Sequence, residues 1–234
     1  MDMHKVSVLY KKDFKEVVKN PAMFVICIVP LFFALFFSKM GMMDAEGAMV
    51  YGMLMNLTMV GILLISSMVA EEKEKYTLRT LMLSNVSALD FLSAKIFVAF
   101  TFLTVTNILI YVISGMSMAY LLPYIATTIL GGFPVLILSA AIGIQARDQM
   151  STSVLQLPVM FLFLLPPMLG GVNKTFMFIA KIVPTGATLQ LFGGFMKDSG
   201  FTKNMILNVV VLVAWIGISA FVFAFCYKRK GLDN

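Results

Sequence analysis

Five long stretches of this chain contain no Asp, Glu, Lys or Arg, and each is at least as long as a membrane-spanning helix. About 20 apolar residues cross the hydrocarbon core of a bilayer, so each of the four shorter stretches predicts one transmembrane helix. The longest stretch predicts two helices, because small residues and a proline interrupt it between positions 114 and 123. The sequence therefore predicts six spans, within residues 20–38, 47–70, 96–146 (two spans), 149–173 and 204–227.

The composition excludes the soluble classes of protein. Hydrophobic residues make up 60% of the 234 positions and charged residues only 13%, against roughly 25% charged residues in a soluble domain. Disordered chains are poor in apolar residues, so disorder is excluded as well. Cys27 and Cys226 lie in apolar stretches without metal-ligand spacing, and His4 is the single histidine. We expect an all-α polytopic membrane protein with one transmembrane domain over residues 1–234, and no metal or cofactor on this chain.

A semi-apolar segment between the fifth and sixth spans follows a different pattern. Lys181, Pro184 and several glycines interrupt residues 175–196, which makes a straight spanning helix unfavourable. Such a segment can enter the membrane and return if protein surrounds it. We predict a re-entrant segment within an extracellular region, residues 174–204.

The lysines and arginines predict the orientation. An even number of spans leaves both termini on one side, and 13 of the 18 Lys and Arg residues lie in the termini and the even-numbered loops. The positive-inside rule therefore places both termini in the cytoplasm of a multi-pass plasma-membrane protein. This distribution accounts for the net charge of +6 without nucleic acid, which would need a folded basic domain.

Residues 1–20 predict an amphipathic helix before the first span. Its apolar side chains recur at helical spacing on one face, and lysines cover the other. A helix of this kind lies on the membrane surface with its lysines facing anionic headgroups, although a plain positive-inside anchor is the alternative. Asn20-Pro21 ends this helix. The apolar positions are Val6, Leu9, Tyr10, Phe14, Val17 and Val18.

Residues 71–95 form the most polar segment of the chain. Its first five residues are charged and extend the second span into the cytoplasm. An apolar stripe follows at once, which predicts that another surface packs on it; a solvated loop is the alternative. Ser87 predicts the N-cap of a helix that contains Asp90 and continues into the third span. The stripe consists of Leu78, Leu81, Met82 and Val86.

These features resemble the membrane subunits of the type-2 ABC exporter family, which are six-span permeases. The basic segment KKDFKEVVKNPAMF at residues 11–24 resembles the family's "elbow" helix, and residues 180–184 resemble its proline-bearing stretch after the fifth span. The departures are Tyr76 where the family usually has glycine, Arg79 where glutamate is common, and Asn85 where proline is common. The loop pattern E-x-E-x-G-T-L-E-x-L-L-x-x-P-V-S is matched by Glu72, Glu74, Thr77, Leu78, Leu81, Val86 and Ser87, followed by Phe91 and Lys95.

The resemblance implies a permease that works with a separate ATPase. The chain carries no G-x-x-x-x-G-K-[ST] pattern, so ATP and Mg²⁺ are expected on a cytoplasmic ABC ATPase subunit, and this chain is not expected to be an enzyme. Six spans form half a transporter, so a second permease subunit is implied, either a copy of this chain (a homodimer) or a relative. Arg147 and Asp148 are expected as a second ATPase contact, with a membrane-edge ion pair as the alternative. The resemblance assigns ATPase contact to Thr77, Leu78, Leu81 and Met82, with Glu71, Glu72 and Glu74 as charged supports.

Polar residues within the spans are candidates for a translocation path. Polar groups in a membrane are costly unless they face protein or water, so hydrogen bonding between helices is the alternative. The 20 methionines and 21 phenylalanines favour a hydrophobic or amphipathic substrate, such as a peptide, a drug or a lipid-like molecule. We expect efflux of antimicrobial peptides or drugs. The candidates are Asn56, Thr58, Asn107 and Gln156.

Other classes of membrane protein fit less well. An intramembrane protease with an E-E-x-x-x-R motif would need arginine at Tyr76, and His4 precedes every span. An ion-coupled secondary transporter usually carries ionisable residues at mid-membrane, which these span cores lack. This secondary transporter and a non-transporting scaffold are kept as the alternatives.

Overall fold

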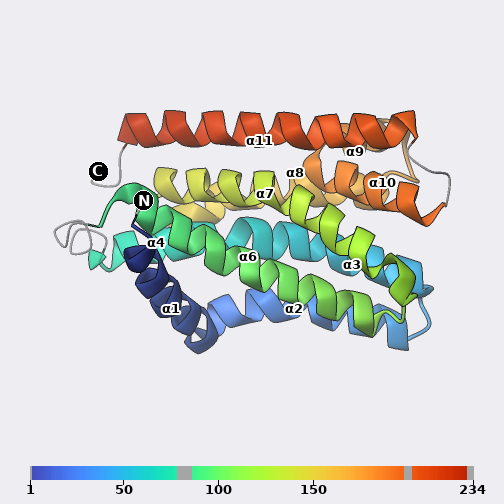
Figure 1. Ribbon diagram of the computed structural model, residues 1–234, viewed down its shortest axis with the longest axis horizontal. Coiled ribbons are helices and arrows are strands. Elements are labelled where there is room, and N and C mark those ends of the chain that lie inside the picture. The colour runs from blue at the N-terminus through green and yellow to red at the C-terminus, as the bar shows by residue number, and fades with distance from the viewer. Residues whose placement is uncertain (1, 78–85, 198–201, 231–234) are drawn as a thin grey trace.

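The computed structural model describes residues 2–77, 86–197 and 202–230, and these ranges contain helices and no strand. Within them, six helices are long and apolar enough to cross a membrane, as the sequence predicts (Figure 1). The spans run over Pro21–Lys39, Ala45–Glu74, Leu89–Ile113, Met118–Gln145, Gln149–Leu169 and Lys203–Arg229. The prediction of an all-α polytopic membrane protein is confirmed.

Twelve helical segments are described in these ranges, and two of them are not α-helices. A π-helix, η1, interrupts the second span, and a short 3₁₀-helix, η2, precedes α7. In chain order the segments are α1 (Met3–Lys19), α2 (Pro21–Lys39), α3 (Ala45–Thr58), η1 (Met59–Leu64), α4 (Ile65–Glu74), α6 (Ala88–Ile113), η2 (Met118–Tyr120), α7 (Leu121–Gln145), α8 (Gln149–Leu169), α9 (Lys174–Ile182), α10 (Pro184–Met196) and α11 (Lys203–Lys230).

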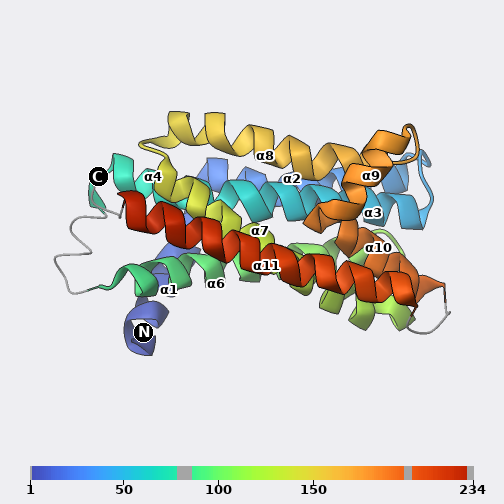
Figure 2. The same ribbon diagram turned by 90° about the horizontal axis from the view of Figure 1, so that it is seen from above.

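The second span, made of α3, η1 and α4, is the centre of the bundle. It is the most buried of the six spans, followed by α7, whereas α2 and α11 are the least buried. In Figure 1, α11 and α2 lie on opposite sides of α3 and α4, and Figure 2 shows α8 along a further side. The outer helices expose large apolar side chains, such as Phe32 on α2 and Phe221 on α11. Apolar surface of this extent is stable against lipid and not against water.

The two ends of the bundle carry different elements. One end holds α1, the C-terminal end of α4, the start of α6, the turn between α7 and α8, and the end of α11 (Figures 1 and 2). We call this the α1 end. The opposite end holds the α2–α3 turn, η2 and the region of α9 and α10. Gly41 and Gly115 form turns at that opposite end with φ of 64° and 73°, which glycine adopts without a steric penalty.

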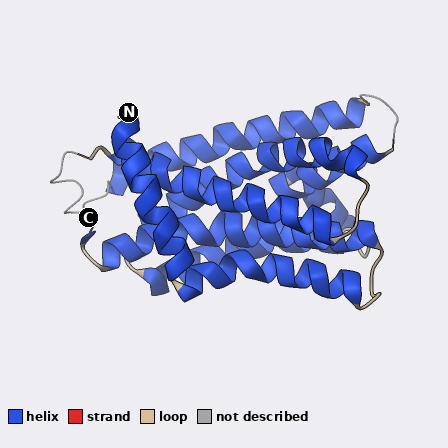
Figure 3. Ribbon diagram, turned by 60° about the horizontal axis from the view of Figure 1, so that its bottom comes forward, coloured by secondary structure: helices blue, strands red, loops and turns tan. Residues whose placement is uncertain are grey.

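Helix α1 confirms the predicted amphipathic helix and also shows what its apolar face contacts. The helix crosses the end of the bundle obliquely (Figure 3), and Asn20 ends it by capping α2, with Pro21 in the first turn of α2. Val17 is fully buried in the core of the bundle, Phe14 stacks on the Phe102 ring while its outer side stays exposed, and Val18 is exposed. The predicted apolar face is therefore divided: one part packs on protein and the other is free to contact lipid.

Helices α9 and α10 form the bent pair that corresponds to the predicted re-entrant segment. Their axes differ by 90° at Val183, where Pro184 begins the second helix. Gly186 allows the bend, because a Cβ atom there would lie 2.0 Å from the carbonyl oxygen of Ala180. Helix α10 packs against α7 and α11, whereas most of α9 is exposed. A pair of helices bent by this angle fits either a broken span or a re-entrant loop, so the re-entrant segment stays a prediction.

Candidate functional site

A cluster of charged side chains joins α1, α4 and α6 at the α1 end of the bundle. Asp13 on α1, Glu72 on α4 and Lys95 on α6 are 1%, 3% and 0% exposed. The Lys95 Nζ atom lies 3.3 Å from Asp13 Oδ2, 3.5 Å from Glu72 Oε1 and 4.7 Å from the centre of the Phe91 ring. Buried charges are tolerated when such partners surround them. The three side chains therefore hold three helices together.

Lys12 and Thr77 complete this cluster from its exposed side. Lys12 pairs with Glu72, and its Nζ atom lies 3.6 Å from Asp13 Oδ1 and 3.8 Å from Glu16 Oε2. The Thr77 hydroxyl donates to the Glu72 carboxylate. Burial alone would lower the pKa of Lys12, but its hydrogen bond to Glu72 and the negative charge of Glu72 raise it above the ordinary value. Lys12 therefore stays charged and completes the neutralisation of Glu72.

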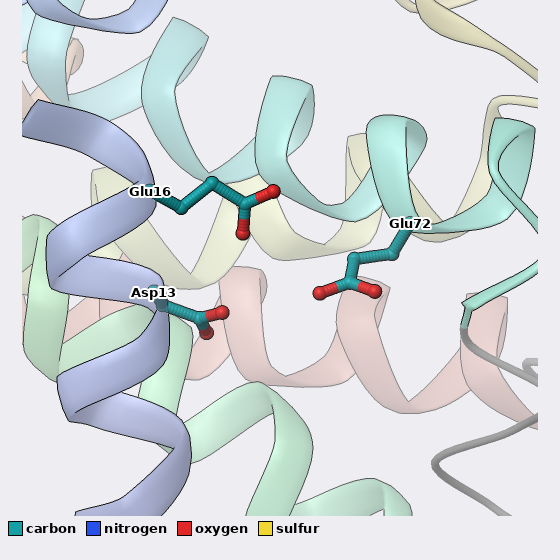
Figure 4. Close-up of side chains that lie close together, drawn as sticks. All are labelled: Asp13, Glu16 and Glu72. Atoms are coloured by element: carbon teal, nitrogen blue, oxygen red, sulfur yellow. The ribbon is translucent and has the colours of Figure 1, made fainter. Parts of the chain in front are cut away.

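Three carboxylates of this cluster were tested as a metal site. The side chains of Asp13 and Glu16 point from α1 toward Glu72 on α4, and their ligand oxygens lie within 4.8 Å of one another (Figure 4). However, the ammonium groups of Lys12 and Lys95 lie within ion-pair distance of these same carboxylates. Two fixed positive charges repel a divalent cation at this range. We interpret the cluster as an ion-pair network and assign no metal to it.

The turn between α7 and α8 lies at the same end of the bundle and is ordered by a helix cap. The Asp148 carboxylate accepts a hydrogen bond of 2.7 Å from the Ser151 backbone, and the Ser151 hydroxyl accepts one of 3.1 Å from the Asp148 backbone. This capping box begins α8. The hydrogen bonds from Ser151, first from its backbone and then from its side chain, lower the pKa of Asp148. The side chains of Arg147 and Asp148 are both exposed at this turn.

The end of the second span is bonded directly to this turn. Lys73 donates hydrogen bonds to the carbonyl oxygens of Ile144 and Ala146, the second at 3.1 Å. The Glu74 Oε2 atom accepts a hydrogen bond of 3.2 Å from the backbone of Gln149. The two segments with predicted ATPase contacts, around residue 74 and around residue 147, therefore form one continuous surface.

The residues with predicted ATPase contacts divide into buried and exposed groups. Glu71 is 4% exposed and accepts hydrogen bonds from Lys75 and from Asn20 Nδ2, the latter at 3.1 Å. Glu71 and Glu72 thus brace the helices beneath the surface, while Glu74, Thr77, Arg147 and Asp148 are exposed on it. The predicted contacts Leu78, Leu81 and Met82 lie outside the described residues.

Tyr76 has a backbone conformation that usually requires glycine. Its φ is 56°, in the left-handed region, and its side chain is 82% exposed. The exporter family that the sequence resembles usually has glycine at this position. The turn that glycine would favour is therefore present here, and the tyrosine side chain projects outward from it.

The four polar residues of the predicted translocation path are all buried in the bundle. Asn56 donates to the carbonyl oxygen of Leu103 at 3.0 Å and accepts from the Thr106 hydroxyl at 2.8 Å. Asn107 accepts from the Tyr124 hydroxyl at 3.3 Å. These bonds join α3 to α6 and α6 to α7. They are the contacts that the interhelical alternative predicts, and the translocation path stays a prediction.

Of the other two predicted path residues, Thr58 directly precedes the π-helix η1, and Gln156 on α8 bonds Ser66, which lies just after η1. Thr58 donates to the carbonyl oxygen of Leu54 at 2.8 Å. Ser66 follows η1, and its hydroxyl donates to Gln156 Oε1 at 2.7 Å, while its backbone N–H donates to the Ser139 hydroxyl at 3.1 Å. A π-helix is a widened turn that often occurs at functional sites. The most buried span thus has an irregular centre, with hydrogen bonds to α7 and α8 beside it.

Sequence analysis missed the two central members of the charged cluster. The predicted helix after Ser87 already included Lys95, but Lys95 was assigned to the cytoplasmic segment of residues 71–95, and its burial about two turns inside α6 was not predicted. Asp13 was not singled out. It follows Leu9 by four residues and precedes Val17 by four, which places it on the apolar face of α1. An acid on an apolar helix face was the signal that could have identified it.

Neither a protein-family model nor a curated protein matches this chain. The fold defines the class of protein as a multi-pass, all-α membrane protein with an amphipathic helix bound across one end of its bundle.

Proposed function

We propose that this chain is the membrane subunit of an ATP-driven ABC exporter. A separate cytoplasmic ATPase subunit would bind ATP and Mg²⁺, and a second permease subunit, a copy of this chain or a relative, would complete the transporter. The observation that carries the proposal is the direct bonding of the two predicted ATPase-contact segments. Lys73 and Glu74, at the end of the second span, bond the turn that contains Arg147 and Asp148.

A surface formed in this way is suited to transmit movement of a partner into the bundle. Force on residues 74–77 would act on α4, which continues through η1 into α3, the most buried span. The same force would reach α1 and α6 through Glu72, which pairs with Lys12 and Lys95. Packed elements of this kind move as bodies, so a displacement at one end is carried along the span.

The proposed substrate is hydrophobic or amphipathic: a peptide, a drug or a lipid-like molecule, with antimicrobial-peptide or drug efflux preferred. Two observations support this class of substrate. The spans are apolar, and no charged side chain lies near the middle of their described residues, since Lys95 and Glu72 lie at the α1 end. The proposed location is a bacterial plasma membrane, with the α1 end in the cytoplasm. Lysine-rich α1 at that end supports this orientation.

Co-purification from a mild detergent tests the proposal. The tagged chain should bring along an ATP-binding subunit in stoichiometric amount, identified by mass spectrometry. Recovery of the chain alone from several detergents, with intact permease dimers, would contradict the exporter and favour a secondary transporter or a scaffold.

A matched pair of charge reversals sharpens this test. Glu74→Lys removes the bond to Gln149 and reverses a charge on the proposed contact surface. Glu46→Lys reverses an exposed charge in the first turn of α3, at the opposite end. We expect loss of the ATPase from the first variant and full recovery with the second, at equal yields of folded chain. Equal recovery from both variants would contradict the assigned surface.

A further inference from the structure

A pocket of about 560 Å³ opens at the α1 end, between α1, the start of α2 and the end of α4. Neither Arg147 nor Asp148 lines it. Four lysines contribute to its wall, together with two carboxylates and the Asn20-Pro21 junction where α2 begins. The lysines are Lys12, Lys15, Lys19 and Lys75, and the carboxylates are Glu16 and Glu71.

Two of these lysines have no acidic partner within residues 2–77, 86–197 and 202–230. Lys12 pairs with Glu72, and Lys75 pairs with Glu71, so their charges are compensated. Lys15 and Lys19 are exposed and one helical turn apart on α1. Among the described residues, no carboxylate oxygen lies within 4.0 Å of the ammonium group of either. The pocket therefore has an uncompensated positive charge on its α1 wall, which suits an anion.

An exposed apolar stripe on α2 begins directly at this pocket. Pro21 lines the pocket, and α2 continues from it with exposed apolar side chains four, seven, eleven and fourteen residues later, a spacing that keeps them on one helix face. At about 1.5 Å per residue the stripe is about 15 Å long, which matches the roughly 15 Å of hydrocarbon in one leaflet. The stripe consists of Val25, Ile28, Phe32 and Leu35.

We propose that this pocket binds the phosphate headgroup of an anionic phospholipid, whose acyl chains lie along the exposed stripe of α2. Cationic lysines recognise the phosphodiester, and basic pockets at the membrane boundary are suited to such headgroups. A bound headgroup touches α1 through Lys15 and Lys19 and lies beside Lys75, just beyond α4. It therefore fastens α1 to the end of the second span. The inference does not depend on the proposed transport function.

The source of the phosphate is the membrane, because the apolar stripe adds contacts that a soluble phosphate cannot make. A phospholipid that places its acyl chains on α2 also replaces exposed apolar surface of α2 with lipid contacts. Inorganic phosphate or glycerol phosphate would meet the lysines alone. The lipid should therefore bind much more tightly than either soluble anion.

Lipid titration by native mass spectrometry tests the site on the full chain in mild detergent. Phosphatidylglycerol should be retained, whereas phosphatidylcholine, glycerol phosphate and inorganic phosphate should be lost at the same concentration. Each lysine near an anionic headgroup contributes about fivefold to the affinity, so Lys15→Gln with Lys19→Gln should weaken retention of phosphatidylglycerol by about 30-fold. Lys15→Arg with Lys19→Arg should restore it, which excludes misfolding as the cause.

A control pair with the same loss of charge is Lys11→Gln with Lys228→Gln. Both lysines are exposed at the α1 end and lie outside the pocket. The control should retain phosphatidylglycerol nearly as well as the unaltered chain. Equal weakening by both pairs would overturn the pocket in favour of a diffuse charge effect. Equal affinity for phosphatidylcholine would overturn the headgroup assignment, and equal affinity for glycerol phosphate would overturn the membrane source.

Discussion

Removal of the Lys95 charge should destabilise the protein more than any other single lysine change at the α1 end. Lys95→Met keeps the length of the side chain but leaves Asp13 and Glu72, 1% and 3% exposed, without the cation at 3.3 and 3.5 Å. Removing one partner of a buried ion pair costs about 3–5 kcal/mol of unfolding free energy. Because Lys12 still pairs with Glu72, we expect a value near the lower limit, about 3 kcal/mol.

The assay is thermal unfolding in mild detergent, with Lys11→Met, at an exposed position of α1, as the control. In a chain of this size 1 kcal/mol corresponds to about 2–4 °C in Tm, so Lys95→Met should lower Tm by about 10 °C and Lys11→Met by little.

The double variant Asp13→Asn with Lys95→Met separates the ion pair from simple packing. It removes both charges, and Glu72 retains Lys12 and Thr77. It should therefore be about 2 kcal/mol less destabilised than the sum of the two single variants. A Tm for Lys95→Met equal to that of Lys11→Met, or strict additivity in the double variant, would refute the ion-pair network as the link between α1, α4 and α6.

Three further predictions concern the turn after α4, the cap of α8 and the polar contact beside η1. Tyr76→Gly should leave Tm equal or raise it, because it relieves a left-handed conformation that costs about 1 kcal/mol and removes a side chain that is 82% exposed. Tyr76→Val should lower Tm, and a higher Tm for Tyr76→Val than for Tyr76→Gly would contradict the strain. The lowered pKa of Asp148 gives a stabilisation that is present above pH 3.8 and is lost as the pH falls through the folded-state pKa. Asp148→Ala should therefore have a lower Tm than the unaltered chain at pH 7, and the difference in Tm should shrink in acid. A difference in Tm that is independent of pH would contradict the cap. Gln156→Leu should cost about 0.6 kcal/mol if its bond to Ser66 is purely structural, and a loss of transport activity at unchanged Tm would instead place Gln156 on the path.

Features that depend only on composition and on local sequence pattern could be predicted from the sequence. The charge-free stretches predicted all six spans, because a bilayer requires about 20 apolar residues whatever the tertiary contacts are. The cap at Ser87 was also predictable, and its hydroxyl accepts the Asp90 N–H at 3.1 Å. Local chemistry alone determines both features.

The charged cluster and the irregular second span depend on contacts between distant segments. Lys95 pairs with Asp13, 82 positions away, and its burial follows from the packing of α1 against α6. No pattern in the segment MVGILL distinguishes the π-helix of residues 59–64 from an ordinary helix. The direct bond between Glu74 and Gln149 likewise requires the packing of α4 beside the α7–α8 turn. Sequence periodicity describes one helix at a time and leaves these pairings undetermined.

Site-specific photo-cross-linking in membranes tests most directly whether the α1 end receives an ATPase. A photoreactive residue replaces Thr77 or Arg147, both exposed on the proposed contact surface, or Glu46 or Thr175, both at the opposite end. We predict an adduct with an ABC ATPase subunit from positions 77 and 147 and none from positions 46 and 175. The absence of that adduct from positions 77 and 147, in membranes that contain the complete set of cellular ATPases, would contradict the proposed coupling surface.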